Sequence, residues 1–559
     1  MTLRARGWGT IALALVACML ILGRNSSRKL RALRAAAARA EAKTHGPPPI
    51  PIEVHAPVAR RPRILLDPPT LERLREARKR DSPAWRRVRK ACDESIDKPI
   101  GGGYQGFDWA DIVANLSVCW HATGERRYAE RALYYLQALL DDRFKVGDKQ
   151  GGDDVVTHDT GYPIRTHASF AALAYDWLHD APGMTPELRA RILGRLKVWL
   201  RWYDTKGYMR DDPYANYFCG YLAATTFAGL ATAGDAPEGE RWLAFARDHL
   251  LARLQLPALA NQMRGGAWPE GWQYGEFSTT EIALIAKAFQ TATGVVLARK
   301  IPWLGEVVTH HVHQLMPPGH AVYDGGTWGD HPAHPSTTAL RAITIALEGV
   351  DDARVAEARW LISHAQPNWW GFDETWVALL AERPGAPERD PHAGAPLGLY
   401  LSGSGLGFWR SDWGKNAVWL SYQNGPRVTW DHQHNDQGHF ELWRGGDGLF
   451  IDAGDEEGDA TINHNTLLID DGGKHITYSP NQGVWGQTVV PARVDDDGQV
   501  VVVRGDFAAA YTPKCVEDGC VERSVHKALR QLVYVRPALL VLADQVALDE
   551  KDIGVTWIA

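Results

Sequence analysis

The sequence predicts a large α-helical domain followed by an antiparallel β-sandwich, and three observations support this. Between residues 63 and 383, apolar residues recur at three- and four-residue steps, the period of amphipathic helices. After a proline- and glycine-rich linker at 384–396, the period changes to two, which is typical of strands with one buried face. The chain has 559 residues, too many for one hydrophobic core, so two large domains are expected.

The helical part is a series of apolar segments separated by glycine- or proline-rich connections. Such helical hairpins can form a bundle, a solenoid or a closed α/α toroid, and periodicity does not decide among these. The predicted helical segments are 109–120, 128–140, 167–178, 188–202, 217–230, 242–254, 282–289, 339–347 and 355–362.

The C-terminal part, 397–559, contains short alternating segments that predict an antiparallel β-sandwich. The predicted strands are 399–401, 405–409, 417–422, 440–443, 449–452, 467–469, 500–504, 530–535 and 538–543.

The N-terminus has the pattern of an export signal. Arg4 and Arg6 precede an apolar run at 8–22 that is short for a membrane span. We therefore predict that residues 1–27 are a signal peptide or a membrane anchor. The protein is expected in the periplasm, on the membrane or at the cell surface. Residues 28–62 are basic and then proline-rich, and they are predicted to be a linker.

Charge and cysteine content restrict the partners and the compartment. A net charge of −6 argues against a nucleic-acid partner, whereas an acidic sugar remains compatible because a local arginine cluster can serve one cleft. Six cysteines are too few for a disulfide scaffold. Cys515 and Cys520 flank a short loop that a disulfide would close. Cys92, Cys119 and Cys219 lie in helical patterns and are expected to be buried free thiols.

A polar cluster is expected in the C-terminal domain. His432, His434 and Asp436 stand two residues apart, a spacing that points side chains to one face of a strand. A glycine-rich turn and a returning strand bring Asp452 toward them, and a third strand carries His464. Two histidines and a carboxylate suit Zn²⁺, since imidazole nitrogen and carboxylate oxygen both ligate that ion. The alternative is a set of hydrogen-bonded polar residues at a sheet edge.

These residues belong to a longer ordered motif, which consists of His432-Gln-His434-Asn-Asp436, Phe440, Gly448, Asp452-Ala-Gly454 and His464-Asn465-Thr466-Leu467. The motif resembles the signature of the heparinase II/III-like polysaccharide lyases. The resemblance implies an incomplete, alginate-lyase-like α/α toroid at 63–383 and a β-sandwich at 397–559, several strands shorter than in the family. It implies that His434, Asp452 and His464 hold a structural Zn²⁺, and that His432 faces the substrate cleft.

The glycine-rich, aromatic loop 265–278 precedes a helix and is similar to the family segment that carries a catalytic tyrosine. The resemblance assigns that role to Tyr274, with Trp268, Glu270 and Trp272 as substrate-binding neighbours. The alternative is a helix-entry loop whose aromatic rings pack on the next hairpin, with Glu270 as a capping residue.

Two further helix starts resemble cleft segments of the family. Asn216 fits a donor that neutralises a uronate carboxyl group, but the family's neighbouring histidine is absent, and an N-cap is the rival interpretation. Tyr162 and Arg165 fit residues that line the cleft, with Arg165 attracting an acidic sugar. A structural salt bridge is the alternative for Arg165.

Two other positions complete the expected substrate site. The glycine-aromatic loop 323–331 contains Trp328 and His331, and Arg427 lies just before the histidine segment. All three are predicted to contact the substrate.

The resulting prediction is a polysaccharide lyase that cleaves a uronate-containing glycan by β-elimination. Tyrosine would act as base and acid, with Asn216, His432 and Arg165 neutralising the uronate. One alternative is a glycoside hydrolase that uses two carboxylates, and a second is a non-catalytic glycan-binding envelope protein. The hydrolase would draw its carboxylates from Glu270, Glu276, Asp324 and Asp330.

Overall fold

The computed structural model divides the chain into residues Met1–Ile50 and a compact unit, Pro51–Ala559, to which the following sections refer. The residues it describes are 47–101, 106–141, 158–317, 321–323, 336–364, 375–429, 432–452, 460–470, 482, 489–511, 515–516, 519–520, 525–548 and 554–558. The predicted export segment, 1–27, therefore lies outside the described residues. No helix within the described ranges is long and apolar enough to span a membrane.

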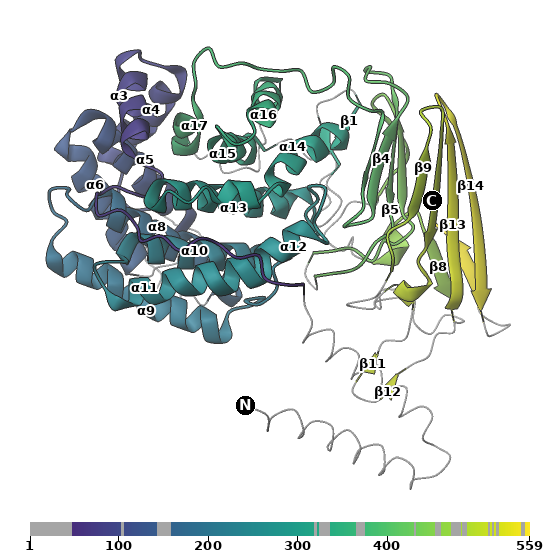
Figure 1. Ribbon diagram of the computed structural model, residues 1–559, viewed down its shortest axis with the longest axis horizontal. Helices are drawn as coiled ribbons and strands as arrows, with labels where there is room; N and C mark the ends of the chain where they lie inside the picture. The colour runs from purple at the N-terminus through teal and green to yellow at the C-terminus, as the bar shows by residue number, and fades with distance from the viewer. Residues whose placement is uncertain are drawn as a thin grey trace, which may run out of the picture. The chain divides into compact units, whose positions relative to one another are not determined.

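Six helices form the inner layer of the helical domain. Each contacts the next along the chain, and the last contacts the first, which is the arrangement of an α/α toroid (Figure 1). The fold predicted from the sequence, helical domain first and antiparallel sheets second, is confirmed. The inner helices are α5 (Phe107–Thr123), α8 (Ile164–Trp177), α10 (Asn216–Thr232), α13 (Gly271–Thr293), α15 (Thr337–Leu347) and α17 (Thr375–Ala381).

Burial separates this layer from the outer helices. Every residue of α10 is buried, whereas α9 buries one stripe consisting of Ile192, Leu196, Trp199, Leu200 and Tyr203. The outer and connecting helices are α3 (Pro68–Lys79), α4 (Pro83–Ile96), α6 (Arg126–Leu140), η2 (Asp159–Gly161), α9 (Pro186–Lys206), α11 (Pro237–Phe245), η3 (Ala246–Gln255), α12 (Leu256–Ala260), η4 (Leu297–Lys300), α14 (Trp303–Gln314) and α16 (Asp352–His364).

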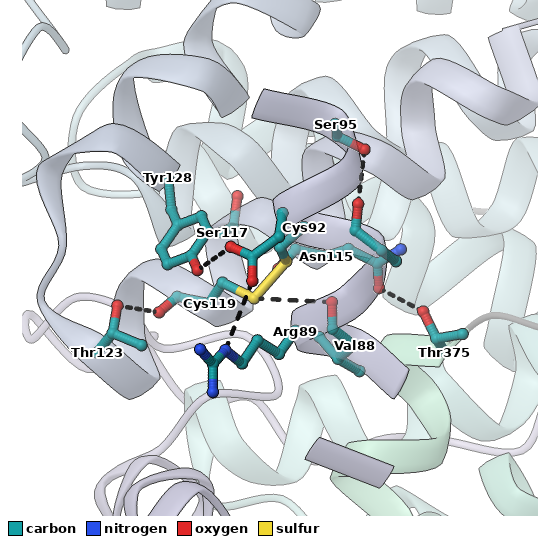
Figure 2. Close-up of a disulfide and its surroundings, with 12 residues drawn as sticks. Val88, Arg89, Cys92, Ser95, Asn115, Ser117, Cys119, Thr123, Tyr128 and Thr375 are labelled. Carbon is teal, nitrogen blue, oxygen red and sulfur yellow. Dashed lines mark hydrogen bonds and ion pairs between the residues drawn. A yellow bond between two sulfur atoms is a disulfide. The ribbon is translucent and has the colours of Figure 1, made fainter. Parts of the chain in front are cut away.

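A disulfide joins two helices of the toroid (Figure 2). Cys92 of α4 and Cys119 of α5 have Cα atoms 6.9 Å apart. The expectation that both are free thiols is wrong, because packing of α4 against α5 brings together cysteines 27 residues apart in the chain. Cys219 is buried and free, as expected. Cys515 and Cys520 are opposite each other in a short hairpin, but the structure does not describe their side chains.

The C-terminal domain contains two main antiparallel sheets (Figure 1). One has the order β3-β4-β5-β6-β7 and the other the order β14-β13-β10-β9. Their facing sides form a core that includes Trp409, Tyr422 and Phe440 from the first sheet and Val503 and Tyr534 from the second. The strands are β3 (Gly398–Leu401), β4 (Leu406–Arg410), β5 (Val418–Gln423), β6 (Phe440–Arg444), β7 (Asp447–Phe450), β9 (Arg493–Asp496), β10 (Val500–Asp506), β13 (Val525–Val535) and β14 (Leu539–Leu548).

Three two-stranded pairs and two short 3-10 turns complete the described elements. The pair β8–β15 lies beside the sandwich, and the pair β1–β2 follows α14. These elements are β1 (Leu315–Met316), β2 (Ala321–Val322), η5 (Thr461–Asn463), β8 (Leu467–Asp470), η6 (Ala508–Tyr511), β11 (Cys515–Val516), β12 (Gly519–Cys520) and β15 (Gly554–Trp557).

The other face of the five-stranded sheet packs on the helical domain. Phe408 and Trp419 share a cluster with Ala267 and Tyr323 from the helical part. The indole of Trp419 donates a 2.9 Å hydrogen bond to the carbonyl oxygen of His313 at the end of α14. Because this sheet is covered on both faces, all five residues of β4 are buried.

Three histidines of α14 are buried at this interface. Burial lowers the pKa of His310 to about 4 and those of His311 and His313 to about 3. The ring of His310 lies 5.5 Å from Phe408, and that of His311 lies 4.6 Å from Trp272. These histidines are therefore neutral in the folded protein at neutral pH.

We predict that the histidines of α14 make the fold sensitive to acid. A histidine with a lowered folded pKa contributes stability above its unfolded pKa of about 6.5 and loses it as the pH falls toward its folded pKa. The contribution of each histidine to the free energy of unfolding should fall by about 1 to 2 kcal/mol between pH 7 and pH 5. The melting temperature of the wild type and of His311→Phe should be measured across this range. The variant should show the shallower decline, and equal slopes would contradict the prediction.

We also predict that the Cys92–Cys119 disulfide stabilises the helical domain by about 3 to 4 kcal/mol, from the loop-closure entropy of the unfolded chain. Thermal melting of the oxidised protein, of the reduced protein and of the Cys92→Ser/Cys119→Ser variant measures this. The last two should melt at the same lower temperature. Cys219→Ser is the control for loss of a thiol outside the disulfide, and reduction should still lower its melting temperature.

Candidate active site

A histidine–carboxylate cluster lies where the loops of the sandwich meet. One ligand atom from each of His434, Asp452 and His464 lies within 4.8 Å of the other two. The Nδ1 atom of His464 is 2.9 Å from Oδ2 of Asp452, and the rings of His434 and His464 are 5.1 Å apart. All three side chains are buried. The structure thus brings together the three residues predicted to be metal ligands.

The charge of Asp452 depends on these neighbours. Burial alone would raise its pKa, but the charge of His464 and the hydrogen bond to it hold the pKa well below its usual range. The second oxygen, Oδ1, is buried and has no hydrogen-bond partner among the described residues. A buried carboxylate oxygen beside two imidazoles fits a cation of the Zn²⁺ type. His434, Asp452 and His464 would hold it.

The strand expected to carry the histidines is not formed. His432 to His439 form an irregular segment, and β6 begins only at Phe440. The backbone has positive φ at His432 (55°) and Gly438 (83°), and each interrupts the alternation of a strand. Asp452 follows the end of β7, and His464 lies between η5 and β8. The cluster is therefore assembled from loops at strand ends and not from strand faces.

A second carboxylate and histidine support the cluster, and we did not predict either of them. The ring of His439 accepts a hydrogen bond from the amide of Asn465 at Nδ1, and its Nε2 lies 3.6 Å from Oδ2 of Asp452. Burial, together with the charge of Asp452, raises the pKa of Glu441 to about 8. The sequence feature that could have identified both residues is the His-x-Glu spacing at 439–441. Asp436, predicted to share the cluster face, is buried, and burial raises its pKa to about 6.

Tyr274 and His432 lie against each other. Their rings are stacked, with centroids 4.1 Å apart and planes 14° apart. Tyr274 is in the first turn of α13, and His432 is in the loop before β6. Both are partly exposed. A phenol from the helical domain and an imidazole from the sandwich thus meet at this junction, each with part of its surface exposed.

Asn216 and Glu270 form a closed polar pair behind this junction. The backbone and side-chain N–H groups of Asn216 donate to the two carboxylate oxygens of Glu270, at 2.6 and 3.0 Å. The indole of Trp268 donates to the same carboxylate at 2.8 Å. Asn216 and Glu270 are both fully buried. Asn216 is the first residue of α10 and Ala215 is the N-cap, so the N-cap interpretation is wrong.

Arg165 is tied into the same network. It donates to Oδ1 of Asn216 at 3.2 Å and to the hydroxyl of Tyr162 at 2.8 Å. It also forms an ion pair with Glu281 at 3.5 Å. The salt bridge considered for Arg165 is thus present. Burial raises the pKa of Tyr162 to about 12, so this phenol is neutral.

The aromatic residues of the loop before α13 pack inside the protein. Trp268 lies 6.1 Å from Trp303, and Trp272 lies 4.6 Å from His311; both partners belong to α14. Trp268 and Trp272 are buried, as expected if the loop packs on the next hairpin. Arg427 is also buried and donates to Asn435 at 2.6 Å. The other predicted substrate contacts, Trp328 and His331, lie outside the described residues.

Comparison with known protein families identifies the C-terminal domain. Residues 398–557 match the family described as "Heparinase II/III-like, C-terminal". This is a heparinase II/III-like domain. The resemblance that the histidine motif indicated is therefore confirmed over this part of the chain. A comparison with curated protein sequences finds no match to this chain.

Solved structures similar to this chain include a heparinase III and a heparan sulfate lyase. A crystal structure of heparinase III is 13% identical, and the match covers 79% of this chain and 62% of that one, with a TM-score of 0.49. The heparan sulfate lyase HepC from Pedobacter heparinus is 16% identical, with coverage of 89% and 79% and a TM-score of 0.46. The chain thus spans less than two thirds of the heparinase III structure.

We predict that the histidine–carboxylate cluster of the heparinase II/III-like domain binds Zn²⁺ and that the metal stabilises the fold. The wild type should contain about one zinc per chain by elemental analysis. Its melting temperature should fall on chelation and recover with Zn²⁺. His434→Ala should lose the metal and the chelator response.

His179→Ala is the matched control, because His179 lies on the helical domain beside Asp180. It should retain both metal and chelator response. The prediction would be contradicted if the wild type contained no metal and if neither chelator nor Zn²⁺ changed its melting temperature.

Proposed function

We propose that this protein is a polysaccharide lyase that cleaves a uronate-containing glycan by β-elimination. The stacked pair of Tyr274 and His432 is the observation that carries this proposal. A phenol and an imidazole from different domains meet there, and His432 stands two residues before His434 of the histidine–carboxylate cluster. The heparinase II/III-like domain supports the same reaction class.

The proposed reaction requires two proton movements at one sugar linkage. A base removes the proton from the carbon next to the uronate carboxyl group, and that electron pair forms a carbon–carbon double bond. The bond from the adjacent carbon to the glycosidic oxygen breaks, and this oxygen leaves with the bonding pair and takes up a proton. No oxidant and no water are consumed, and the new chain end is unsaturated.

Tyr274 is proposed as the group that removes the proton and then returns it to the leaving oxygen. A phenol becomes a base at neutral pH only if a nearby positive charge favours its anion. The ring of His432 lies against Tyr274, so a protonated imidazole here would supply that charge. His432 is thus proposed to act on Tyr274 and on the uronate carboxyl group together.

We propose that Asn216 and Arg165 contribute to the reaction by holding the start of α13, which carries Tyr274, in position. Both were expected to neutralise the uronate directly, but their side chains are buried and bonded within the protein. Through Glu270 they join the start of α10 to the loop that precedes α13. This linkage supports the helix end that carries Tyr274.

The carboxylate-pair hydrolase is less well supported by the described residues. Glu270 is fully buried and already accepts hydrogen bonds from Asn216 and Trp268. It is therefore poorly placed to act as an acid or base on a glycan. Asp324 and Asp330 lie outside the described residues.

Export from the cytoplasm is part of the proposal. Disulfides persist mainly in oxidising compartments, and the Cys92–Cys119 bond fits a periplasmic or extracellular location. The apolar run near the N-terminus supports the same location.

We predict that Tyr274→Phe abolishes elimination while the protein remains folded. Loss of a general acid–base group should lower turnover by about 10² to 10⁴-fold. The assay follows ultraviolet absorbance of the unsaturated product with uronate polymers as substrates. His432→Ala should cause a comparable loss.

Tyr134→Phe is the matched control, because Tyr134 is an exposed tyrosine on α6 and should be replaceable without effect. Full turnover of Tyr274→Phe would remove this tyrosine from the mechanism. New reducing ends without absorbance in the wild type would favour the hydrolase, and binding without cleavage would favour the non-catalytic protein.

A further inference from the structure

The strands β5 and β6 are joined by a hairpin loop, 424–439, and His432 lies near its tip. Gln423 is the last residue of β5 whose backbone pairs with the other arm. Its N–H donates to the carbonyl oxygen of His439 at 2.9 Å, and its own carbonyl oxygen accepts from Gly438 at 2.8 Å. Among the described residues, no backbone hydrogen bond joins the two arms of the loop beyond this point. Backbone pairing therefore does not fix the position of His432.

Amide side chains continue the pairing at every second residue of the returning arm. The side-chain oxygen of Gln437 accepts from the backbone N–H of Gly425 at 2.6 Å, and that of Asn435 accepts from the guanidinium of Arg427 at 2.6 Å. These pairs keep the antiparallel register of β5 and β6, because each step of two residues on one arm matches a step of two on the other. His434, which stands between them and the tip, belongs to the histidine–carboxylate cluster instead.

Gln433 is the next member of this series and is adjacent to His432. Its Oε1 atom accepts from the backbone N–H groups of Val428 and Thr429, at 2.8 and 3.2 Å. Its Nε2 atom donates to the carbonyl oxygen of Pro426 at 3.0 Å. One side chain therefore bonds three backbone groups of the opposite arm. It fastens the two arms together at the last position before His432.

The arm that Gln433 holds is itself attached to the helical domain. The hydroxyl of Thr429 donates to Oδ2 of Asp212, which precedes α10, at 3.2 Å. His432 has a φ of 55°, and a non-glycine residue persists in this conformation only where the surrounding structure holds it. The hydrogen bonds of Gln433 supply such support at the neighbouring residue. They thus connect the backbone of His432 to the domain that carries Tyr274.

We propose that Gln433 is a positioning residue that holds the ring of His432 against Tyr274, and its part in catalysis rests on the proposed function. Reacting groups are effective only when their supporting contacts fix them close to the productive geometry. The three hydrogen bonds of Gln433 involve none of the predicted metal ligands. Gln433 therefore acts on His432 separately from the histidine–carboxylate cluster.

The test observes the stacking itself, in protein without substrate. 3-Fluorotyrosine is placed at position 274, and its fluorine NMR resonance is recorded. A neighbouring aromatic ring shifts such a resonance, so His432→Ala gives the position without stacking. Gln433→Ala should move the resonance toward that position by about half of the difference or more, because the arm that carries His432 loses its attachment. A resonance that is the same in His432→Ala and the wild type would overturn the proposal.

The matched control is Gln545→Ala, because Gln545 is an exposed glutamine of β14 that accepts a hydrogen bond from Lys527. It should leave the resonance in place, and a movement in Gln433→Ala no larger than in this control would overturn the proposal. Thermal melting checks that each variant is folded. Gln433→Met, which keeps the length of the side chain without its hydrogen bonds, decides the matter if Gln433→Ala does not fold.

Turnover on uronate polymers separates this inference from the proposed function. In an active lyase, Gln433→Ala should lower kcat by about 10- to 100-fold with little change in KM, because the reacting groups are misplaced. If the resonance moves but the wild type forms no unsaturated product, the lyase fails and the positioning of His432 stands. If the wild type is active and neither the resonance nor kcat changes in Gln433→Ala, the lyase stands and the positioning role fails. A displaced resonance with unchanged kcat would overturn the part of Gln433 in the reaction.

Discussion

The carbonyl groups at the end of α14 are the point on which the arrangement of the two domains depends. The last carbonyls of a helix have no partner within it, and here side chains of the sheet supply one. Arg410 of β4 donates to the carbonyl oxygens of His313 and Leu315, at 3.1 and 2.7 Å. Trp419 of β5 donates to His313 as well. A cation at the negative end of a helix dipole strengthens this attachment.

This attachment positions the junction where chemistry is proposed. The strand β5 leads through the segment 424–439 into β6, and that segment carries His432. The sheet is fixed to α14, and the loop before α13 packs on α14 through Trp268 and Trp272. The positions of Tyr274 and His432 therefore both depend on packing against α14. Their 4.1 Å stacking follows from two separate packing interfaces.

Charge is distributed differently on the two sides of the junction. On the sheet side, Asp452 is ionised and surrounded by imidazoles, which suits a cation. On the helical side, the carboxylate of Glu270 accepts hydrogen bonds from three N–H donors. The contact that we propose with a uronate is therefore the one at Tyr274 and His432.

The sequence by itself determined the order of the domains, the identity of the three clustered residues, and Tyr274 as the leading candidate. The order of the domains follows from periodicity, which is a local property of the chain. The three residues and Tyr274 were assigned from the resemblance of their motifs to the heparinase II/III-like lyases. Spacing misled where the backbone departed from regular geometry: positive φ at His432 and Gly438 removed the strand that a period of two predicted. Alternation in sequence does not reveal such a break.

Only the tertiary structure decided which residues contact each other. The disulfide between Cys92 and Cys119, the closed pair of Asn216 and Glu270, and the stacking of Tyr274 on His432 each join residues distant in sequence. Which distant groups meet depends on how helices and sheets pack, and packing is set by the whole core. A chain read in order specifies which chemical groups are present, but not which of them end up buried against each other.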